Sequence, residues 1–515
     1  GCVVRLPLVL SGAVVLCCFW TSVHAIADIG QADGFFSVRE FGAKGDGDAD
    51  DTKAFQDALD AAGEVGGWVM VPPVGPGKGY VLTETVVLPE GVALVGCPFG
   101  MGSNVRAVFD LRDSKVKGAA IFARPTASQY EGRQKSPLFQ LSPGCTLKGL
   151  WIMYDQQPMP ADEDFQDPGS PYYYESFDEA KSRFTQDHVK PYGPTVYCAY
   201  GPNIVIEDII CDRYYDFAYM DRVGKCHFNR ITLHGYKRAF VFEVSRDVIH
   251  MDNIAYVPNV GPQAPGGPHR GRHYSWVYGI IASQPDNVGI HLGSADGYSL
   301  SDIFFFGIHT ALRLGYSPDY PLFDPVAGES APDLEPGRGP WGSIAGFMTD
   351  QCAVGIHFVW PCYLTNRIAN TLIFPSFSDG RTFPAVAGTG PLADVGQQAA
   401  FLVSSSHSRQ NCNGRMPTFM CSNTVIASFS DRDRFASASA AAHQANGRVF
   451  LLDGDILMEL SNFQANAPYS DDRIWARGAN AKDFHIRAHG FVVNSQPKPD
   501  LLIDGLAGPT PAPGQ

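Results

Sequence analysis

Several short runs in this sequence, rich in β-branched and other apolar residues, share an equivalent position that mostly carries a polar, ionisable or aromatic side chain. In chain order these residues are Tyr219, Val241, His291, Arg313 and His357, and two positions further on stand Asp221, Glu243, Gly293, Gly315 and Val359. Carboxylates, imidazoles, a guanidinium and a phenol suit general acid–base catalysis, or the neutralisation of an acidic group on a ligand. The two glycines would leave space for that ligand.

The spacing of these runs predicts a solenoid. Tyr219 and Val241 are 22 residues apart, as are His291 and Arg313, and His357 follows Arg313 by 44. Only the step from Val241 to His291 is longer, because the Pro/Gly-rich segment 258–272 intervenes. A period of about 20–25 residues, with apolar residues alternating with one outward position, is typical of stacked β-strand coils. We therefore expect an all-β, single-stranded parallel β-helix with these residues in one column on its outer surface.

The same residues have a plainer interpretation. A single outward His or Arg is usually a surface residue. Asp221 could simply pair with Arg222 or Arg238 at the surface, which contributes little to stability. Matching positions on one face favour a functional column, with Asp221, Glu243, His291, Arg313 and His357 as catalytic candidates. A second set is expected to form a polar ladder that satisfies backbone groups: Asn229, Asn253, Asp302 and Asn366.

Long insertions leave the predicted coils at three places, 155–192, 258–272 and 318–341. Aromatic-rich insertions on a solenoid can wall its binding face. We expect these segments to flank a groove, with substrate-binding residues at Tyr173, Tyr219, His269, Arg270 and Trp360.

The 515-residue chain has a formal net charge of −14 and is 45% hydrophobic. The negative charge argues against nucleic acid or an acidic membrane surface as a partner. It is compatible with an acidic polysaccharide if the groove is locally basic. Residues 1–25 have the pattern of a secretory signal peptide, with Arg5, an apolar run from Leu6 to Trp20 and small residues in Val23-His-Ala25. We therefore expect a secreted protein.

Of the 12 cysteines, three lie within residues 1–25 and nine remain. An odd number leaves at least one without an intramolecular partner. Cys412 with Cys421, and Cys352 with Cys362, are plausible disulfide pairs in an oxidising compartment. No cysteine or histidine grouping has zinc spacing, so no structural zinc is expected.

The N-terminal region carries a recognisable set of sequence motifs: Phe41-Gly-Ala-Lys-Gly-Asp-Gly47, Asp50-Asp-Thr52, Gly66-Gly-Trp-Val-Met-Val-Pro72 and Pro89-Glu-Gly-Val-Ala-Leu-Val-Gly96. This stretch resembles the pectate-lyase-like superfamily, of the rhamnogalacturonase/epimerase type. The resemblance implies a right-handed β-helix domain over residues 34–500, in which 34–96 form the cap and first coils. A helix over 51–62 would plug the first coil, and Asp46, Asp50 and Asp51 would be structural. Residues 501–515 are expected to be a disordered tail.

The resemblance implies a polysaccharide as substrate, and an open groove suits a long polymer. Two carboxylates on adjacent coils favour glycoside hydrolysis. The alternative is β-elimination on a uronate polymer, with His291 or His357 as the base and Arg313 neutralising the carboxylate. A third possibility is a non-catalytic carbohydrate-binding or adhesion solenoid. The catalytic sequence motifs of polygalacturonases and of alginate epimerases are missing. We expect no cofactor, with Ca²⁺ only in the case of a lyase, and a monomer or homotrimer.

Overall fold

The computed structural model describes residues 34–97, 118–126, 130–131, 134–257, 275–317, 321–322, 339–350, 352–359, 365–373, 399–404, 418–426, 448–465, 475–477, 484–490, 492–493, 496–497 and 501–504. The predicted signal peptide and three predicted binding residues, His269, Arg270 and Trp360, lie outside these ranges. None of the helices within them is long and apolar enough to cross a membrane.

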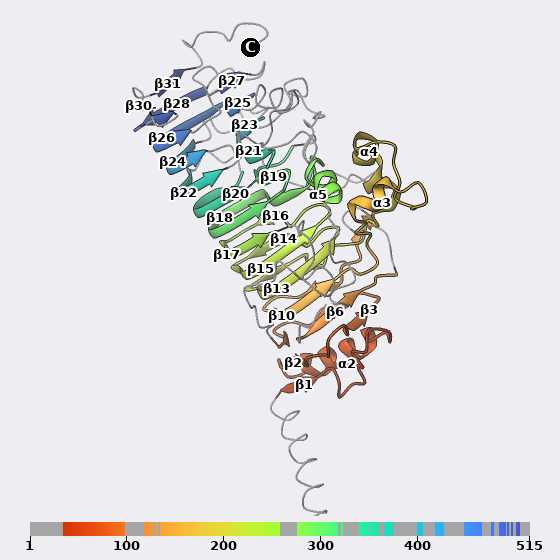
Figure 1. Cartoon of the computed structure of the whole chain (residues 1–515). Helices are drawn as coiled ribbons and strands as arrows, with labels where there is room; N and C mark the ends of the chain where they lie inside the picture. Colours follow the sequence, from red (N-terminus) through yellow and green to blue (C-terminus); the bar gives the residue numbers. More distant parts are fainter. Residues whose placement is uncertain are drawn as a thin grey trace, which may run out of the picture.

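The chain winds into an elongated stack of parallel strands, the right-handed β-helix that the resemblance implies (Figure 1). One wall, the bent sheet, is made of long strands that pair with the strand one coil away. Its strands are β2 (Trp68–Val71), β5 (Ala93–Gly96), β10 (Thr146–Met153), β13 (Val205–Tyr214), β15 (Cys226–Gly235), β17 (Ile249–Tyr256), β18 (Val288–Phe306), β20 (Trp341–Asp350), β22 (Asn366–Ile373), β24 (Thr418–Ile426), β26 (Ile456–Ala465) and β28 (Phe484–His489).

The facing wall, the site sheet, consists of shorter strands. They are β4 (Val86–Leu88), β9 (Phe139–Leu141), β11 (Val196–Cys198), β12 (Gly201–Pro202), β14 (Ala218–Gly224), β16 (Phe240–Ser245), the first half of β18, β19 (Thr310–Leu314), β21 (Val354–Phe358), β23 (Ala399–Val403), β25 (Arg448–Leu452) and β27 (Trp475–Arg477). The remaining strands are β1 (Phe35–Ser37), β3 (Tyr80–Leu82), β6 (Ala120–Ala123), the β7 (Tyr130–Glu131) and β8 (Gln134–Lys135) hairpin, β29 (Val492–Val493), β30 (Gln496–Pro497) and β31 (Leu501–Asp504). β31 pairs antiparallel with β28, so residues 501–504 are ordered, in contrast to the predicted tail.

Each long strand of the bent sheet turns a corner at one residue in the left-handed backbone region. The non-glycine residues at this corner are Asp208, Arg230, Asn253, Asp302, Asn370, Asn423 and Asn462, with φ between 50° and 56°. Asn and Asp predominate because their short polar side chains tolerate this conformation better than most. Asn462 donates to Asn423 (3.1 Å), and Asn423 donates to Asn370 (3.2 Å). A polar ladder is therefore present, but these three hydrogen-bonded members are not the predicted ones; of the predicted set, Asn253 and Asp302 lie at the corner.

Two members of the predicted ladder are wrong. Asn229 lies one position before the corner, where it pairs in register with Asp252. Asn366 starts β22 and is fully buried, where it accepts a hydrogen bond from the Tyr298 hydroxyl at 2.7 Å. A sequence shows that a residue is polar near a turn, but the corner position depends on the coil register.

The interior of the coils is a continuous apolar core. On the site sheet, Ile290, Leu292, Leu312 and Leu314 point inward and are fully buried. Because each coil contributes only a few such residues, burial becomes favourable through stacking on the neighbouring coils.

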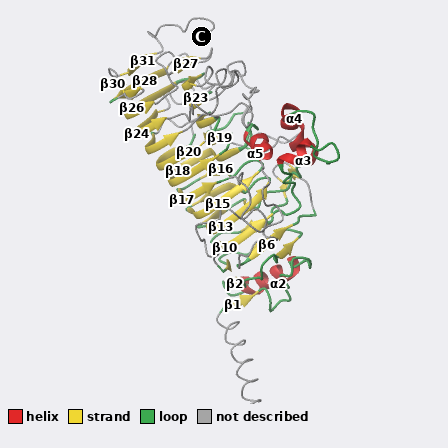
Figure 2. Cartoon of the chain, viewed as in Figure 1, coloured by secondary structure: helices red, strands yellow, loops and turns green. Residues whose placement is uncertain are grey.

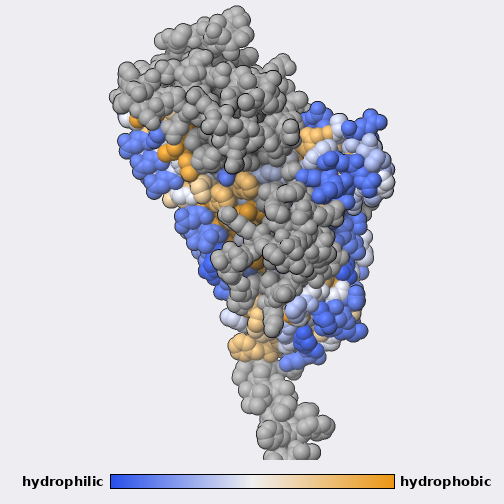
Figure 3. Space-filling model, viewed as in Figure 1, coloured by the Kyte–Doolittle hydropathy of each residue, from blue (hydrophilic) through white to orange (hydrophobic). Residues whose placement is uncertain are grey.

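The helix α2 (Thr52–Gly63) closes the first coil as the resemblance implies, with Ala54, Phe55, Ala58, Leu59 and Ala62 buried. Asp51 occupies the N-cap position, but its carboxylate does not cap the helix. It accepts hydrogen bonds from the backbone N–H groups of Lys44 (2.6 Å) and Gly45 (3.0 Å) and so fixes the preceding loop. A small apolar patch lies at this end of the described solenoid, beside hydrophilic residues (Figure 3). Phe35 and Trp68, both in this part of the chain, are half-exposed.

The predicted disulfides are wrong, because Cys352 and Cys421 form no disulfide and their thiols are buried in the core. Cys352 Sγ lies 3.2 Å from Thr349 Oγ1, and Cys421 Sγ lies 2.6 Å from Thr424 Oγ1. The predicted partners, Cys362 and Cys412, lie outside the described residues.

The insertion 155–192 folds into α3 (Asp162–Gln166) and α4 (Phe177–His188), which pack with α5 (Ser275–Ala282) beside the solenoid (Figure 2). Phe165, Phe184, Val277 and Ile280 form the centre of this cluster and are fully buried. The insertion is therefore a small helical subdomain with its own core.

Candidate active site

The structure brings the predicted column together. Tyr219 pairs in register with Val241, Val241 with His291, His291 with Arg313 and Arg313 with His357. These residues lie on β14, β16, β18, β19 and β21, and they point away from the coil interior, which is filled by the alternate residues of the same strands. The stacking that the 22-residue period predicts is confirmed.

The exposure predicted for this column is wrong. All five residues are buried, from 0% exposed for His291 to 3% for Arg313. Part of the cover is Leu322, which packs against Tyr219 and Val241 together with the half-buried Tyr197 and Tyr316. Leu322 comes from a later part of the chain than β14 and β16, so a long-range contact covers this part of the column.

A buried ion pair holds this cover. Arg238 donates to both carboxylate oxygens of Asp216, at 2.9 and 3.0 Å, and its Nη1 donates to the Leu322 carbonyl at 3.1 Å. Arg238 and Asp216 are 2% and 1% exposed. The carboxylate partner of Arg238 in this ion pair is thus Asp216 and not Asp221, and its Nη1 links the pair to the cover through the Leu322 carbonyl.

The predicted pair of carboxylates is offset by a β-bulge. Asp221 pairs in register with Val244, so Glu243 is an additional residue in β16 rather than the partner of Asp221. The Tyr219 hydroxyl donates to Glu243 Oε2. Asp221 forms an ion pair with Arg222 at 3.2 Å. The 22-residue offset holds between Met220 and Phe242 and again between Val223 and Ser245, so sequence spacing alone does not reveal the irregularity between them.

The space predicted beside Gly293 is occupied by the protein. A Cβ at Gly293 would lie 2.7 Å from Leu322 Cδ1 and 2.8 Å from the Glu243 carbonyl. Gly315 has φ of +96°, a backbone conformation that favours glycine, and its carbonyl accepts from His291. Gly293 therefore seats the cover, and the Gly315 carbonyl holds a histidine.

His291 has a defined tautomer. Its Nε2 lies 2.9 Å from the Gly315 carbonyl, and because a carbonyl can only accept, Nε2 carries the proton. Its Nδ1 is buried and makes no hydrogen bond with the described residues. Burial first, then the charge of Arg313, holds the pKa of His291 well below its usual range. His291 is therefore a neutral imidazole with an unprotonated Nδ1, and the same burial makes that nitrogen a weaker base than a free imidazole.

Arg313 and His357 form the next layer of the column. Arg313 Nε donates to His357 Nδ1 at 3.3 Å, and Nη2 donates to the Pro285 carbonyl at 2.9 Å. His357 Nε2 lies 2.5 Å from Ser404 Oγ. Burial, followed by the charge of Arg313, lowers the pKa of His357, so it is neutral beside the guanidinium. The guanidinium is the positive charge closest to the His291 base in the column.

Tyr197 is a site residue that the sequence interpretation missed. It precedes Tyr219 in the column, and their rings are 6.0 Å apart. Burial and the charges of Asp221 and Glu243 raise the pKa of Tyr197 to about 12, so its hydroxyl keeps its proton at neutral pH. Extending the 22-residue period one coil back from Tyr219 would have found it.

Of the predicted binding residues, Tyr219 is in the column. Tyr173 lies between α3 and α4 and is 40% exposed, so it is not part of the buried site. Its neighbours Tyr172 and Tyr174 pack within the helical subdomain. The aromatic residues of the insertion thus serve its own core rather than a groove.

The fold defines this protein as a parallel β-helix with a polar column on one wall. Comparison with known proteins adds the family that its N-terminal part resembles. Residues 35–136 match the family described as rhamnogalacturonase A/epimerase, pectate lyase-like. This match confirms the predicted resemblance to the pectate-lyase-like superfamily.

Two curated relatives share part of the sequence. A mannuronan C5-epimerase of Azotobacter vinelandii is 39% identical over 94 residues, which are 16% of this chain and 5% of that protein. Alginate lyase 7 of the same organism is 38% identical over 87 residues, which are 16% of this chain and 10% of that protein. The chain therefore matches only a small part of the length of these relatives.

Among solved structures, the tailspike protein of E. coli bacteriophage HK620, in complex with a hexasaccharide, has a TM-score of 0.50 at 8% identity. The alignment covers 92% of this chain and 68% of the tailspike. At this identity the likeness shows the shared fold alone.

Proposed function

We propose that this chain is a secreted polysaccharide-active enzyme, with its active site in the column on the site sheet. Because the column is buried beneath a cover that includes Leu322, a polymer would reach it only when that cover moves away. Support comes from the polysaccharide-modifying relatives of its N-terminal part, a mannuronan epimerase and an alginate lyase. A buried group of acid, base and cationic side chains on one wall adds to this, because perturbed titratable groups that converge in one place are typical of active sites.

The reaction that the geometry supports best is removal of a proton from the carbon next to a uronate carboxylate. The observation that carries this proposal is the bare Nδ1 of His291, fixed in direction by the Gly315 carbonyl and one coil away from the Arg313 guanidinium. His291 would accept the proton, while Arg313 would neutralise the uronate carboxylate as negative charge spreads into it.

The outcome then depends on what happens to the carbanion. Expulsion of the glycosidic oxygen, protonated by a phenol such as Tyr197 or Tyr219, gives a double bond and a shortened chain. Return of a proton to the opposite face would instead invert the carbon. Both outcomes share the first step, so His291 and Arg313 keep the same roles.

Glycoside hydrolysis is the second candidate. It is favoured by the two buried carboxylates, Asp221 and Glu243, which both act on the pKa of Tyr197 and so lie close to one phenol. Hydrolysis needs one carboxyl group as the acid and the other as base or nucleophile. The bulge at Glu243 and its hydrogen bond with Tyr219 make this arrangement less direct than the sequence spacing suggests.

The test is an assay of the purified full chain on uronate and neutral polymers, following ultraviolet absorbance of unsaturated uronate, new reducing ends and the uronate epimer ratio. We expect His291→Gln to lower turnover by about 10² to 10⁴-fold. The matched control is His250→Gln, because His250 is exposed on the bent sheet and stacks on His227. Reducing ends without absorbance would establish the hydrolase, and binding without any product would establish the adhesion solenoid. Full activity in His291→Gln would overturn the proposed base.

A further inference from the structure

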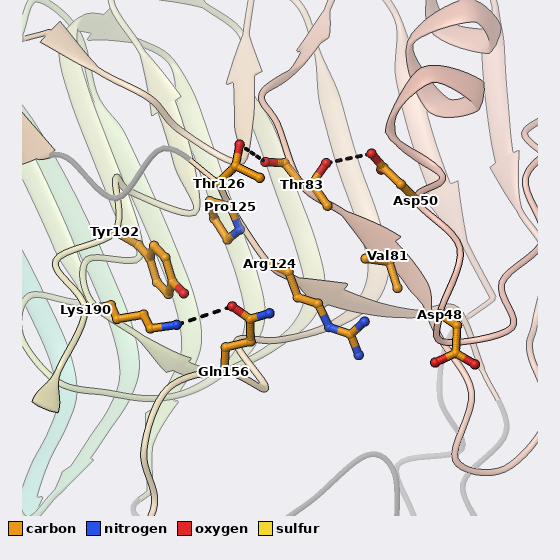
Figure 4. A pocket seen from close by; sticks show the side chains of 10 residues that line it. All are labelled: Asp48, Asp50, Val81, Thr83, Arg124, Pro125, Thr126, Gln156, Lys190 and Tyr192. Atoms are coloured by element: carbon orange, nitrogen blue, oxygen red, sulfur yellow. Dashed lines mark hydrogen bonds between the residues drawn. The ribbon is translucent and has the colours of Figure 1, made fainter.

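A second cleft lies at the N-terminal end of the solenoid, outside the column (Figure 4). Its volume is about 560 Å³, within the range of small-molecule sites. One side is the cap loop with Asp48 and Asp50, and the floor follows β3 and β6 at Thr83 and Arg124. The insertion returns to the coils along the other side, at 190–192. Three separate parts of the chain thus meet around one space.

Some polar groups of this cleft are held rigidly. The Thr83 hydroxyl donates to Asp50 Oδ2 at 2.7 Å, and Asp50 Oδ1 accepts from the Thr52 hydroxyl at 2.6 Å. Arg124 donates to both carboxylate oxygens of Asp155, through Nε at 3.0 and 3.1 Å and Nη2 at 2.8 Å. These hydrogen bonds fix the orientations of the Asp50, Thr83 and Arg124 side chains, so this part of the cleft is preformed.

Other polar groups keep unused capacity. The exposed Asp48 carboxylate accepts no hydrogen bond from the described residues. Lys190 Nζ donates to Gln156 Oε1 at 3.3 Å, and the ammonium has further hydrogens to donate. The Tyr192 hydroxyl has no hydrogen-bond partner among the described residues, although the side chain is only 1% exposed. A buried hydroxyl without a partner is destabilising, and a bound ligand would relieve this.

The chemistry of the cleft selects the kind of ligand. The charged lining groups are Arg124 and Lys190 against Asp48 and Asp50. Asp155 lies behind the lining and pairs with Arg124, so the five groups together carry a net charge of −1. A carboxylate ligand would meet this excess of negative charge. Acceptors, donors and a phenol spread around one space match the several hydroxyls of a sugar ring. Val81 and Pro125 add apolar surface for its C–H face.

We propose that this cleft binds a neutral sugar residue of a polysaccharide. Asp48 accepts hydrogen bonds from its hydroxyls, Lys190 and Gln156 donate to them, and the Tyr192 hydroxyl pairs with one that reaches the floor. The site does not depend on the reaction at the column. If both sites act, the polymer contains neutral residues as well as uronates.

The experiment is isothermal titration of the full chain with hexasaccharides of glucose, mannose and xylose, and with hexamers of galacturonate and mannuronate. At least one neutral hexasaccharide is expected to bind, with affinity about tenfold lower in Asp48→Ala and in Lys190→Met. The control is Lys53→Met, because Lys53 is an exposed lysine of the same cap that pairs with Asp57.

Tyr192→Phe separates a ligand role from a structural one. It is expected to lower sugar affinity while leaving the thermal midpoint unchanged or raised, because the hydroxyl has no partner to lose. A lower midpoint with unchanged affinity would overturn its role. Binding of uronate hexamers alone, absence of binding, or neutral binding that both Asp48→Ala and Lys190→Met leave unchanged would overturn the site. Loss of catalysis in His291→Gln with neutral binding intact separates this inference from the proposed function.

Discussion

Replacement of Asp216 by alanine tests whether the buried ion pair holds the cover of the column. The Arg238 guanidinium is 2% exposed and makes two hydrogen bonds with Asp216, and the Arg238 backbone N–H makes a third at 3.1 Å. Removal of the carboxylate leaves this charge buried without its counter-charge. Breaking a buried pair in this way costs about 3–5 kcal/mol. We expect the free energy of unfolding of Asp216→Ala to fall by that amount.

The double variant Asp216→Ala/Arg238→Met shows whether the cost comes from the stranded charge. An apolar side chain of similar length removes the charge, so the double variant should recover to within about 1–2 kcal/mol of the unsubstituted protein. The coupling free energy between the two positions would then exceed about 2 kcal/mol. The assay is urea unfolding followed by tryptophan fluorescence and circular dichroism at pH 7.

Additive single-variant costs would refute the reasoning, as would a cost for Asp216→Ala below about 1 kcal/mol, the size of a surface pair. A reduced Leu322 contact is a further expectation, because Arg238 Nη1 donates to the Leu322 carbonyl. Faster hydrogen exchange at the Leu322 backbone N–H in Arg238→Met would show that the pair also positions the cover.

Three further changes probe other parts of the fold. Burial lowers the pKa of His309 from 6.5 to about 3, so below pH 6.5 the unfolded chain binds a proton that the folded chain does not. The free energy of unfolding should therefore fall as the pH is lowered. In urea unfolding from pH 6 to 4, His309→Gln should reduce the dependence of this free energy on pH by about 1.4 kcal/mol per pH unit, and an unchanged dependence would contradict this. Asn423→Gly should be less destabilising than Asn423→Ala, by about 1 kcal/mol in urea unfolding, because φ is 51° there. Gly307→Ala should cost at least about 2 kcal/mol, since its Cβ would lie 1.7 Å from the Tyr278 hydroxyl. Gly91→Ala, with similar φ and open space, should cost about 1 kcal/mol, and equal thermal midpoints would contradict the clash.

The coil and its register were readable from the sequence because they follow from local pattern. Alternation of apolar and outward residues fixes which side chains face the core, and a constant coil length fixes which residues stack. Tyr219, His291, Arg313 and His357 therefore fall into one column as expected. The cap followed from its motif, although the role of Asp51 in holding the loop at Lys44 depended on the loop path.

Tertiary structure decided what surrounds that column. Leu322 and Arg238 are 84 residues apart, and their contact covers part of the site sheet. The repeat pattern shows only that the residues of this column point away from the core. The register shift at Glu243 is reversed by Val223 and Ser245, so the 22-residue spacing carries no sign of it. Burial of the column, the tautomer of His291 and the filled space beside Gly293 all result from such long-range contacts. A repeat pattern specifies neighbours within the stack, whereas the path of the loops that leave the stack determines which of its faces meet water.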